Sequence, residues 1–467
     1  MPGPSVFRAG ASPLSGEAAA QGHTLYAYMV SLVAAASGLL FGFDIAVING
    51  AILLLRQQFA LTEFQTEVAA SSLLIGCVFG ASLAGISSDR FGRRRILIVS
   101  AILFALSSAG AALPRDLTEF TAARFAGGLA IGVASVLAPL YIAEVSPARI
   151  RGRLVSLNQM AIVTGILLAY LVNWLLSYHG PESWRWMFAA AILPSAAFFA
   201  GLLFVPESPR WLTENGAEDK AFRVLMRVSG EAQARREIED IKTAIAGESG
   251  SLRELFQPGL RRALLIAVTL AVLQQITGIN TVLFYGSIIF KERVGGHTET
   301  AAIGANVIIG LVNFVATIVA LWLIDRAGRK RLLMWSSGVM AIAQLLLGIA
   351  FLLKPPPAAL VLPAMLFCVA AFAVGLGPGV WVVLAEIFPT RIRGRAMSIA
   401  TISLWVACVA LTMTFLSLAQ AISISGAFWL YSGLCVVTFL FVLFVTPETK
   451  GKTLEEIEEF WYRDRRS

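Results

Sequence analysis

Two charged side chains lie deep inside apolar stretches of this sequence, where a carboxylate beside a fixed cation can bind and release a proton. Asp44 lies well inside the first long apolar run and Arg124 well inside the fourth. A carboxylate alone in hydrocarbon takes up a proton, whereas one beside an arginine stays charged. A carboxylate whose partner moves away could therefore bind and release a proton. The alternative is a fixed ion pair that only holds the two runs together.

Amide side chains form a second polar group within apolar runs. Gln274, Gln275 and Asn280 cluster in the seventh run, Gln159 lies in the fifth and Asn313 in the eighth. An amide offers donors and acceptors in fixed geometry without a charge, so this set suits a neutral ligand rich in hydroxyl groups.

The seventh run also contains Thr277-Gly278-Ile279 between its amides, and we expect the helix to break there. Broken helices mark ligand sites in membrane carriers. The alternative role for an intramembrane amide is a hydrogen bond between helices, and we assign that role to the isolated Asn173 and Gln344.

Composition determines which elements must position these residues. Hydrophobic residues make up 57% of the 467 residues and charged residues only 14%, against roughly 25% charged in soluble domains. A membrane-spanning helix needs about 20 apolar residues. Twelve such runs can be recognised, which predicts a polytopic all-α membrane protein; they lie near 25–55, 64–86, 96–113, 118–143, 154–177, 185–205, 262–290, 300–324, 331–353, 359–385, 396–420 and 426–446.

The net charge of +8 comes mainly from short loops between these runs. Alternate loops near 86–95, 145–153, 325–331 and 387–395 hold 14 Lys and Arg residues, and the loops on the opposite side hold 6. Basic loops stay in the cytoplasm, so we expect both termini inside and no nucleic-acid partner. Asp44 and Arg124 then both lie in the outer half of the membrane, as paired residues must.

The chain divides into two groups of six runs around a hydrophilic segment. Within that segment, 217–228 and 231–246 have the apolar spacing of short amphipathic helices. We expect a disordered tail at 1–24, a first six-helix bundle at 25–205, a cytoplasmic helical linker at 206–261, a second bundle at 262–446 and a cytoplasmic tail at 447–467.

The two groups repeat the same motifs. AEVSPARIRGR at 143–153 returns as AEIFPTRIRGR at 385–395, DRFGRR at 89–94 as DRAGRK at 325–330, and PES at 206–208 as PET at 447–449. Such a repeat predicts two similar bundles related by an axis along the membrane normal.

The repeated motifs place acids and arginines together on the cytoplasmic side. We expect them to pair across the two halves and form a gate that opens and closes the inner end. The alternative is that they only set the topology. The expected gate residues are Asp89, Arg93, Glu144, Arg151, Arg153, Glu207, Asp325, Arg329, Glu386, Arg393, Arg395 and Glu448.

Taken together, the motifs resemble the sugar porter branch of the major facilitator superfamily from about residue 25 to 455. The resemblance rests on GISSDRFGRR, AEVSPARIRGR, VPESPRWL, QQITGIN, LIDRAGRK, AEIFPTRIRGR and TPETKG. It implies a twelve-helix carrier with two bundles and one monosaccharide site at the midplane, exposed alternately to each side of the membrane.

The resemblance also implies roles for individual residues. Gln159, Gln274, Gln275, Asn280, Asn313 and Trp381 match sugar-binding positions, while Phe41 and Phe372 match aromatic positions of the site that could equally serve packing. Two positions depart from the family pattern. Leu404 stands where an amide often precedes Trp405, and Ala373 stands where animal glucose carriers have a glutamate.

In the resembling family, the aspartate and arginine at positions 44 and 124 mark proton symporters. We therefore expect a proton-coupled monosaccharide symporter, with a facilitative uniporter or, less favoured, a non-transporting sugar sensor as alternatives. It is not expected to be an enzyme, to carry a cofactor or to bind a metal. The expected setting is a monomer in the lipid bilayer of a bacterial inner membrane.

Overall fold

The computed structural model describes residues 13–147, 149–247, 252–257, 260–294, 298–388 and 392–450. Every regular element within these ranges is helical, and 12 stretches are long and apolar enough to cross a membrane. The predicted twelve-span all-α architecture is therefore confirmed.

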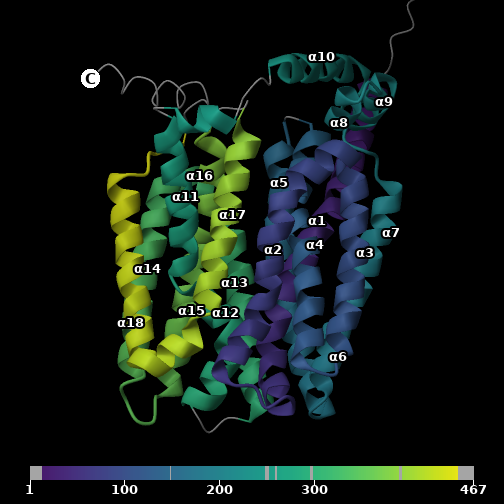
Figure 1. Cartoon of the computed structure of the whole chain (residues 1–467). Helices are drawn as coiled ribbons and strands as arrows, with labels where there is room; N and C mark the ends of the chain where they lie inside the picture. Colours follow the sequence, from purple (N-terminus) through teal and green to yellow (C-terminus); the bar gives the residue numbers. More distant parts are fainter. Residues whose placement is uncertain are drawn as a thin grey trace, which may run out of the picture.

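The first six spans form one bundle, coloured purple to blue-green in Figure 1. Five are single helices, and the sixth consists of two pieces after a short 3-10 turn at Ser177–His179. These helices are α1 (Pro13–Gln58), α2 (Glu63–Phe91), α3 (Arg93–Ala112), α4 (Leu117–Val145), α5 (Arg151–Leu176), α6 (Ser183–Ala189) and α7 (Ile192–Phe204).

The first helix begins earlier than the sequence suggests. Because α1 starts at Pro13, residues 13–24 are helical and not part of a disordered tail. Proline suits the first turn of a helix, and the alanines, glutamate and glutamine that follow favour helix. Residues 1–12 lie outside the described ranges.

The last six spans form the second bundle, green to yellow in Figure 1. Spans 7 and 10 of the chain are each divided into two helices. The elements are α11 (Leu260–Ile276), α12 (Ile279–Ile288), a π-helical turn (Ile289–Val294), α13 (Glu299–Ala327), α14 (Arg329–Ala350), α15 (Ala358–Val374), α16 (Leu376–Glu386), α17 (Arg393–Thr412) and α18 (Phe415–Phe444).

Three short helices connect the bundles: α8 (Pro209–Glu214), α9 (Glu218–Ser229) and α10 (Glu231–Gly247), followed by a 3-10 turn at Leu252–Phe256. The two amphipathic linker helices are thus confirmed as α9 and α10. They bury a small core that includes Leu212, Leu225 and Ile238. Figure 1 shows these helices at one end of the bundles, which we call the linker end; the opposite end is the far end.

The repeated Asp-Arg-x-Gly-Arg motif makes the same turn in both bundles. Gly92 separates α2 from α3 with φ 97°, and Gly328 separates α13 from α14 with φ 89°. Only glycine adopts such angles without strain. A Cβ at Gly92 would also lie 2.5 Å from Glu207 Oε2, and one at Gly328 would lie 2.8 Å from Glu448 Oε2. The turn therefore needs glycine for two independent reasons.

Small residues let helices approach closely within the first bundle, as expected for membrane helices. A Cβ added at Gly128 of α4 would lie only 1.9 Å from the Leu73 carbonyl oxygen of α2. Between the bundles, α1 packs against α12, α2 against α17 and α5 against α13. These three helix pairs form the largest part of the interface along which the two halves meet.

Large apolar side chains face outward from both bundles. Leu193 is 79% exposed, Phe204 86% and Trp335 73%. A water-soluble protein would hide most of this surface, whereas lipid tails solvate it. The fold is that of a multi-pass membrane protein.

Candidate functional site

Span 7 breaks between α11 and α12, as the sequence predicts. Gly278 adopts a left-handed conformation with φ 83° and ends the first helix. A Cβ at this position would lie 2.6 Å from the ring of Tyr431 in α18. Gly278 is thus required both by its backbone angles and by the close approach of a neighbouring helix.

The three amides of span 7 form one chain of hydrogen bonds around this break. Asn280 Nδ2 donates to Gln275 Oε1 at 2.5 Å, and Gln275 Nε2 donates to Gln274 Oε1 at 3.2 Å. All three side chains are at most 8% exposed. Asn280 Nδ2 also lies 3.1 Å from Cys408 Sγ on α17. The structure therefore brings these three predicted site residues together.

The amide chain continues to a second break, in span 10, which the sequence analysis missed. Gln274 Nε2 donates to the carbonyl oxygens of Leu376 at 2.7 Å and Gly377 at 3.1 Å. These carbonyls stand at the start of α16, just after Gly375 ends α15. The Gly- and Pro-rich run GLGPGVW was the available signal for this break.

Two aromatic residues expected at the site flank the span 10 break. Phe372 lies near the end of α15 and Trp381 lies on α16, and both are partly exposed. Gln159 and Asn313 lie on α5 and α13, which pack against each other across the bundle interface. A role for these four residues in binding stays a prediction.

Phe41 connects the two halves. Its ring meets Trp405 of α17 edge to face, with the ring centroids 5.5 Å apart. Such a pair can contribute about 0.5–1.5 kcal/mol beyond its buried area. Phe41 therefore makes a contact that must rearrange whenever the bundles move relative to each other.

The predicted pairing of Asp44 with Arg124 is confirmed. Arg124 Nη1 donates to Asp44 Oδ1, and Arg124 Nη2 donates to the Asp44 carbonyl oxygen at 3.1 Å. Asp44 is 4% exposed and Arg124 1% exposed. The guanidinium also lies over the ring of Phe188, 5.2 Å from its centroid. Removing one partner of a buried charge pair leaves an uncompensated charge and destabilises the protein much more than removing one partner of a surface pair.

At the linker end, an acid and an arginine of the first half form a compact cluster. Arg93 Nε lies 3.2 Å from Glu144 Oε2, and Arg93 Nη1 lies 3.2 Å from Asp89 Oδ1. Glu144 also accepts a hydrogen bond from the Ser208 hydroxyl. Glu207 accepts from the Arg94 backbone N–H at 2.9 Å, so it caps the start of α3.

The second half builds the same cluster from the repeated residues. Arg329 Nη2 lies 2.9 Å from Glu386 Oε1, and Glu386 accepts from the Thr449 hydroxyl. Glu448 accepts from the backbone N–H groups of Arg329 at 3.1 Å and Lys330 at 3.2 Å. Each half therefore contains an acid–arginine pair and a second acid at the start of a helix, and the pair is buried in the first half and partly exposed in the second.

These pairs differ from the cross-half pairing expected when the linker end is closed, and the gate itself stays a prediction. Arg93–Glu144 and Arg329–Glu386 each join helices of one half, whereas the sequence analysis expected pairing across the two halves. The motifs repeat because each bundle closes its own turn with its own acid. Of the other expected gate residues, Arg151 donates to the Ser146 carbonyl oxygen at 3.5 Å, and Arg153 and Arg395 are exposed. The side chains of Asp325 and Arg393 lie outside what the structure describes.

We expect the double substitution Glu144→Gln with Glu386→Gln to favour conformations with the linker end open. The change removes one negative charge from the cluster of each half, and the added net positive charge on both sides opposes the approach of the two ends. Spin-label distances between the linker ends of α4 and α16 measure this shift. A matched control is Glu231→Gln with Glu239→Gln, which changes the same charge on exposed positions of α10. An unchanged distance distribution would leave the clusters as structural turns.

Polar contacts join the two halves toward the far end. Asn49 of α1 donates to the Leu283 carbonyl oxygen at 2.7 Å and accepts from the Ser287 hydroxyl at 2.6 Å. Tyr170 of α5 donates to the same Leu283 carbonyl at 3.0 Å. Gln57 donates to Glu299 at 2.7 Å. The far end is held together in this conformation.

Glu67 is a buried acid that the sequence analysis missed. It is 0% exposed, and its carboxylate accepts from the Ser417 backbone N–H at 2.8 Å and from the Ser417 hydroxyl at 2.6 Å. Glu67 belongs to α2 and Ser417 to the first turn of α18, so this contact also crosses between the halves. A carboxylate at a helix N-terminus is favourable.

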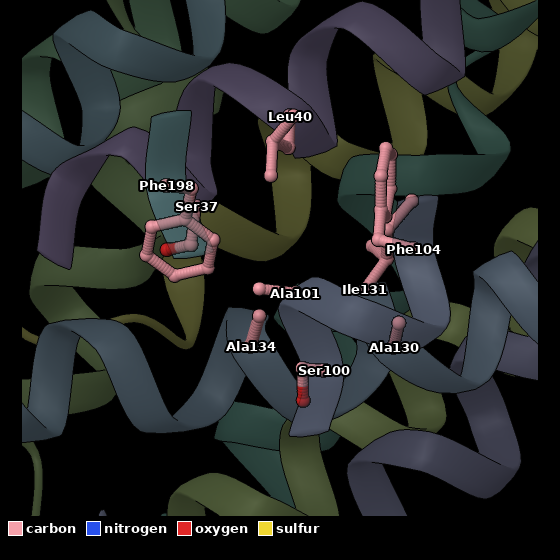
Figure 2. Close-up of a pocket in the computed structure, with 9 residues that line it drawn as sticks. All are labelled: Ser37, Leu40, Ser100, Ala101, Phe104, Ala130, Ile131, Ala134 and Phe198. Carbon is pink, nitrogen blue, oxygen red and sulfur yellow. The ribbon is translucent and has the colours of Figure 1, made fainter. Parts of the chain in front are cut away.

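A separate small pocket lies inside the first bundle, away from the amide chain. Figure 2 shows it between α1, α3, α4 and α7, and its volume is about 10 Å³. That is room for roughly one water-sized sphere, and most of the lining is apolar. We interpret it as a packing gap; its lining consists of Ser37, Leu40, Ser100, Ala101, Phe104, Ala130, Ile131, Ala134 and Phe198.

Comparison with known proteins identifies the family. The family described as "Sugar (and other) transporter" matches residues 30–461 of this chain. The chain belongs to that family. The resemblance noted from the doubled motifs is thereby confirmed.

Several members of the sugar transporter family are similar along almost their whole length. The arabinose-proton symporter of Bacillus subtilis is 40% identical, covering 94% of this chain and 96% of the relative. The D-xylose-proton symporter of Escherichia coli is 38% identical, covering 94% and 97%. A solved structure of the proton:xylose symporter XylE, bound to 6-bromo-6-deoxy-D-glucose, is similar with a TM-score of 0.81 and 38% identity, covering 94% and 99%.

Proposed function

We propose that this protein is a proton-coupled monosaccharide symporter that works by alternating access. The observation that carries the proposal is the buried Asp44–Arg124 pair. The proton affinity of a buried carboxylate depends on its distance from the arginine, so this pair can bind and release a proton as the helices move. Similarity to proteins named as arabinose-proton and xylose-proton symporters supports the same function.

The sugar site that we propose is centred on the amides of span 7. Gln275 and Asn280 use part of their hydrogen-bonding capacity on each other, and each amide has two donor hydrogens and an acceptor oxygen. A hydroxyl-rich ligand can take over these bonds. Gln159, Asn313 and Trp381, with Phe41 and Phe372, complete the proposed site from the surrounding helices.

In the proposed cycle, the two halves rock about this site. The far-end contacts of Glu67, Asn49 and Tyr170 would break to admit sugar and a proton, while the linker ends come together. The excess of basic loops at the linker end supports a cytoplasmic linker end and cytoplasmic termini. We place the protein as a monomer in the cell membrane, with its exposed apolar side chains against lipid.

Uptake by proteoliposomes tests this function. Purified protein is reconstituted and offered labelled D-xylose, L-arabinose, D-glucose and D-galactose, with and without an imposed proton gradient. We expect at least one sugar to accumulate above its external concentration only when the gradient is present. Protein-free liposomes and liposomes with an added proton carrier are the controls.

Equilibration without accumulation would assign the protein as a uniporter instead. Binding of a sugar with no transport of any of the four would favour a sensor. The assay also identifies the transported sugar. The sequence does not identify it, because Leu404 and Ala373 replace residues that could hydrogen bond to particular sugar hydroxyls.

A further inference from the structure

Gln344 makes a contact at the break in span 7. It lies on α14, is 1% exposed, and donates from Nε2 to the Thr277 carbonyl oxygen at 2.5 Å. Its Nε2 also lies 3.5 Å from Cys368 Sγ on α15. The sequence analysis assigned Gln344 to a hydrogen bond between helices, without a reason for its position. The structure places it against Thr277, the single residue between the end of α11 and the left-handed Gly278.

The Thr277 carbonyl needs such a partner because the helix stops there. The last carbonyl groups of a helix have no partner within it, and α11 ends at Ile276. Thr277 is 0% exposed, so water does not reach the group from the surface. In a membrane interior, an unpaired carbonyl costs several kcal/mol. The Cys435 thiol lies 3.7 Å from the same oxygen and is a long, weak donor. The Gln344 amide, at 2.5 Å, is the strong donor that offsets most of this penalty and stabilises the broken conformation.

The break is what allows Gln275 and Asn280 to meet. In an unbroken α-helix, side chains five residues apart point about 140° away from each other. Around the left-handed Gly278, Asn280 instead donates to Gln275 at 2.5 Å. A group that fixes the break therefore fixes the relative position of these two amides.

We propose that Gln344 is a positioning residue for the sugar site, acting through the Thr277 carbonyl on the Gln275–Asn280 pair. This inference rests on the proposed function, because it assumes that the pair binds sugar. Gln344 itself does not touch the sugar. The Gln344 amide fixes the geometry of the break, and that geometry lets Gln275 and Asn280 contact one ligand together.

A double-mutant cycle tests this coupling. Gln344→Met keeps a similar volume and removes the donor, and Gln275→Ala removes one half of the amide pair. The affinity for the sugar selected by uptake is measured by calorimetry for both single variants and the double variant. We expect each single change to raise the Kd about tenfold, as loss of one hydrogen-bonding partner implies. The double variant should be little weaker than either, because coupled residues are not additive.

Asn173 provides the matched control. It is also a buried intramembrane amide and donates to a backbone carbonyl oxygen, that of Val47, at 3.0 Å. Val47 lies inside α1 and not at a helix break. Asn173→Leu should lower the melting temperature about as much as Gln344→Met but leave the sugar Kd within about twofold, since it breaks no carbonyl contact at the site.

The outcomes separate this inference from the proposed function. If Gln275→Ala leaves the Kd unchanged, the sugar site itself is misplaced. If Gln275→Ala weakens binding while Gln344→Met behaves like Asn173→Leu, or if the two changes multiply fully in the double variant, Gln344 does not act through the pair. Should Gln344→Met fail to fold, Gln344→Asn keeps the amide but is one methylene too short to reach Thr277, and the same loss of affinity is expected.

Discussion

Asp44→Asn is expected to abolish uphill sugar accumulation while sugar exchange between equal pools continues. The substitution removes the group that can hold a proton, but it keeps nearly the same volume and an oxygen facing Arg124. The amides of span 7 are untouched, so binding and alternation persist. One proton per sugar gains about 2.3 kcal/mol per 100 mV and about 1.4 kcal/mol per pH unit. Loss of that coupling therefore removes accumulation of tenfold or more.

Two measurements in proteoliposomes check this result. The wild type should alkalinise the external medium when sugar is added and should exchange labelled for unlabelled sugar. Asp44→Asn should retain only the exchange. Asp219→Asn, at an exposed position on α9, makes the same chemical change outside the membrane and should behave as the wild type. Continued accumulation by Asp44→Asn would assign proton coupling to another residue. A wild type that transports sugar without alkalinising the medium would favour a uniporter.

Gln275→Ala and Asn280→Ala should each weaken sugar binding by about 1–3 kcal/mol, because a sugar hydroxyl loses its partner in a buried site. That corresponds to roughly a tenfold or larger rise in Kd. Each change also leaves the other amide of the pair without its 2.5 Å hydrogen bond, so the remaining group is less well oriented. Calorimetry or tryptophan quenching measures the affinity.

The control for these substitutions is Gln233→Ala, an exposed amide on α10 in the linker. It should change neither affinity nor the amount of protein in the membrane. Unchanged binding in both Gln275→Ala and Asn280→Ala, with normal expression, would show that the amide chain serves packing and that the sugar lies elsewhere.

The fold was largely predictable because membrane spans leave a strong signal. Each span is a long apolar run, and the doubled motifs show that the halves correspond. The break at Gly278 was predictable from its position between amides. The break at Gly375 was not, although GLGPGVW carries the right residues. Glycine within a membrane helix can also serve close packing, as Gly128 does, and sequence alone does not separate the two uses.

The hydrogen-bonding and ion-pair partners of the charged residues were harder to predict than the helices on which those residues lie. The pairing of Asp44 with Arg124 could be anticipated because few charges compete inside the spans. At the linker end many acids and arginines compete, and packing selected partners within each half. Glu67 lies only four residues after the start of α2 at Glu63, so the sequence does not distinguish it from a solvated acid near the membrane surface. Its burial depends on Ser417, which lies 350 residues away along the chain.

The clusters at the linker end bear on the order in which this protein is assembled. The partners that Arg93, Glu144 and Glu207 find in the structure all belong to the first 214 residues. The first bundle can thus satisfy the charges of its linker end before the second has been synthesised, in keeping with domains that fold in turn from the N-terminus. The Glu67 carboxylate and the Asn49 side chain instead hydrogen bond to residues of the second bundle. The far-end contacts between the halves therefore form only once the second bundle is present, and in the proposed cycle these late contacts are the ones that must break.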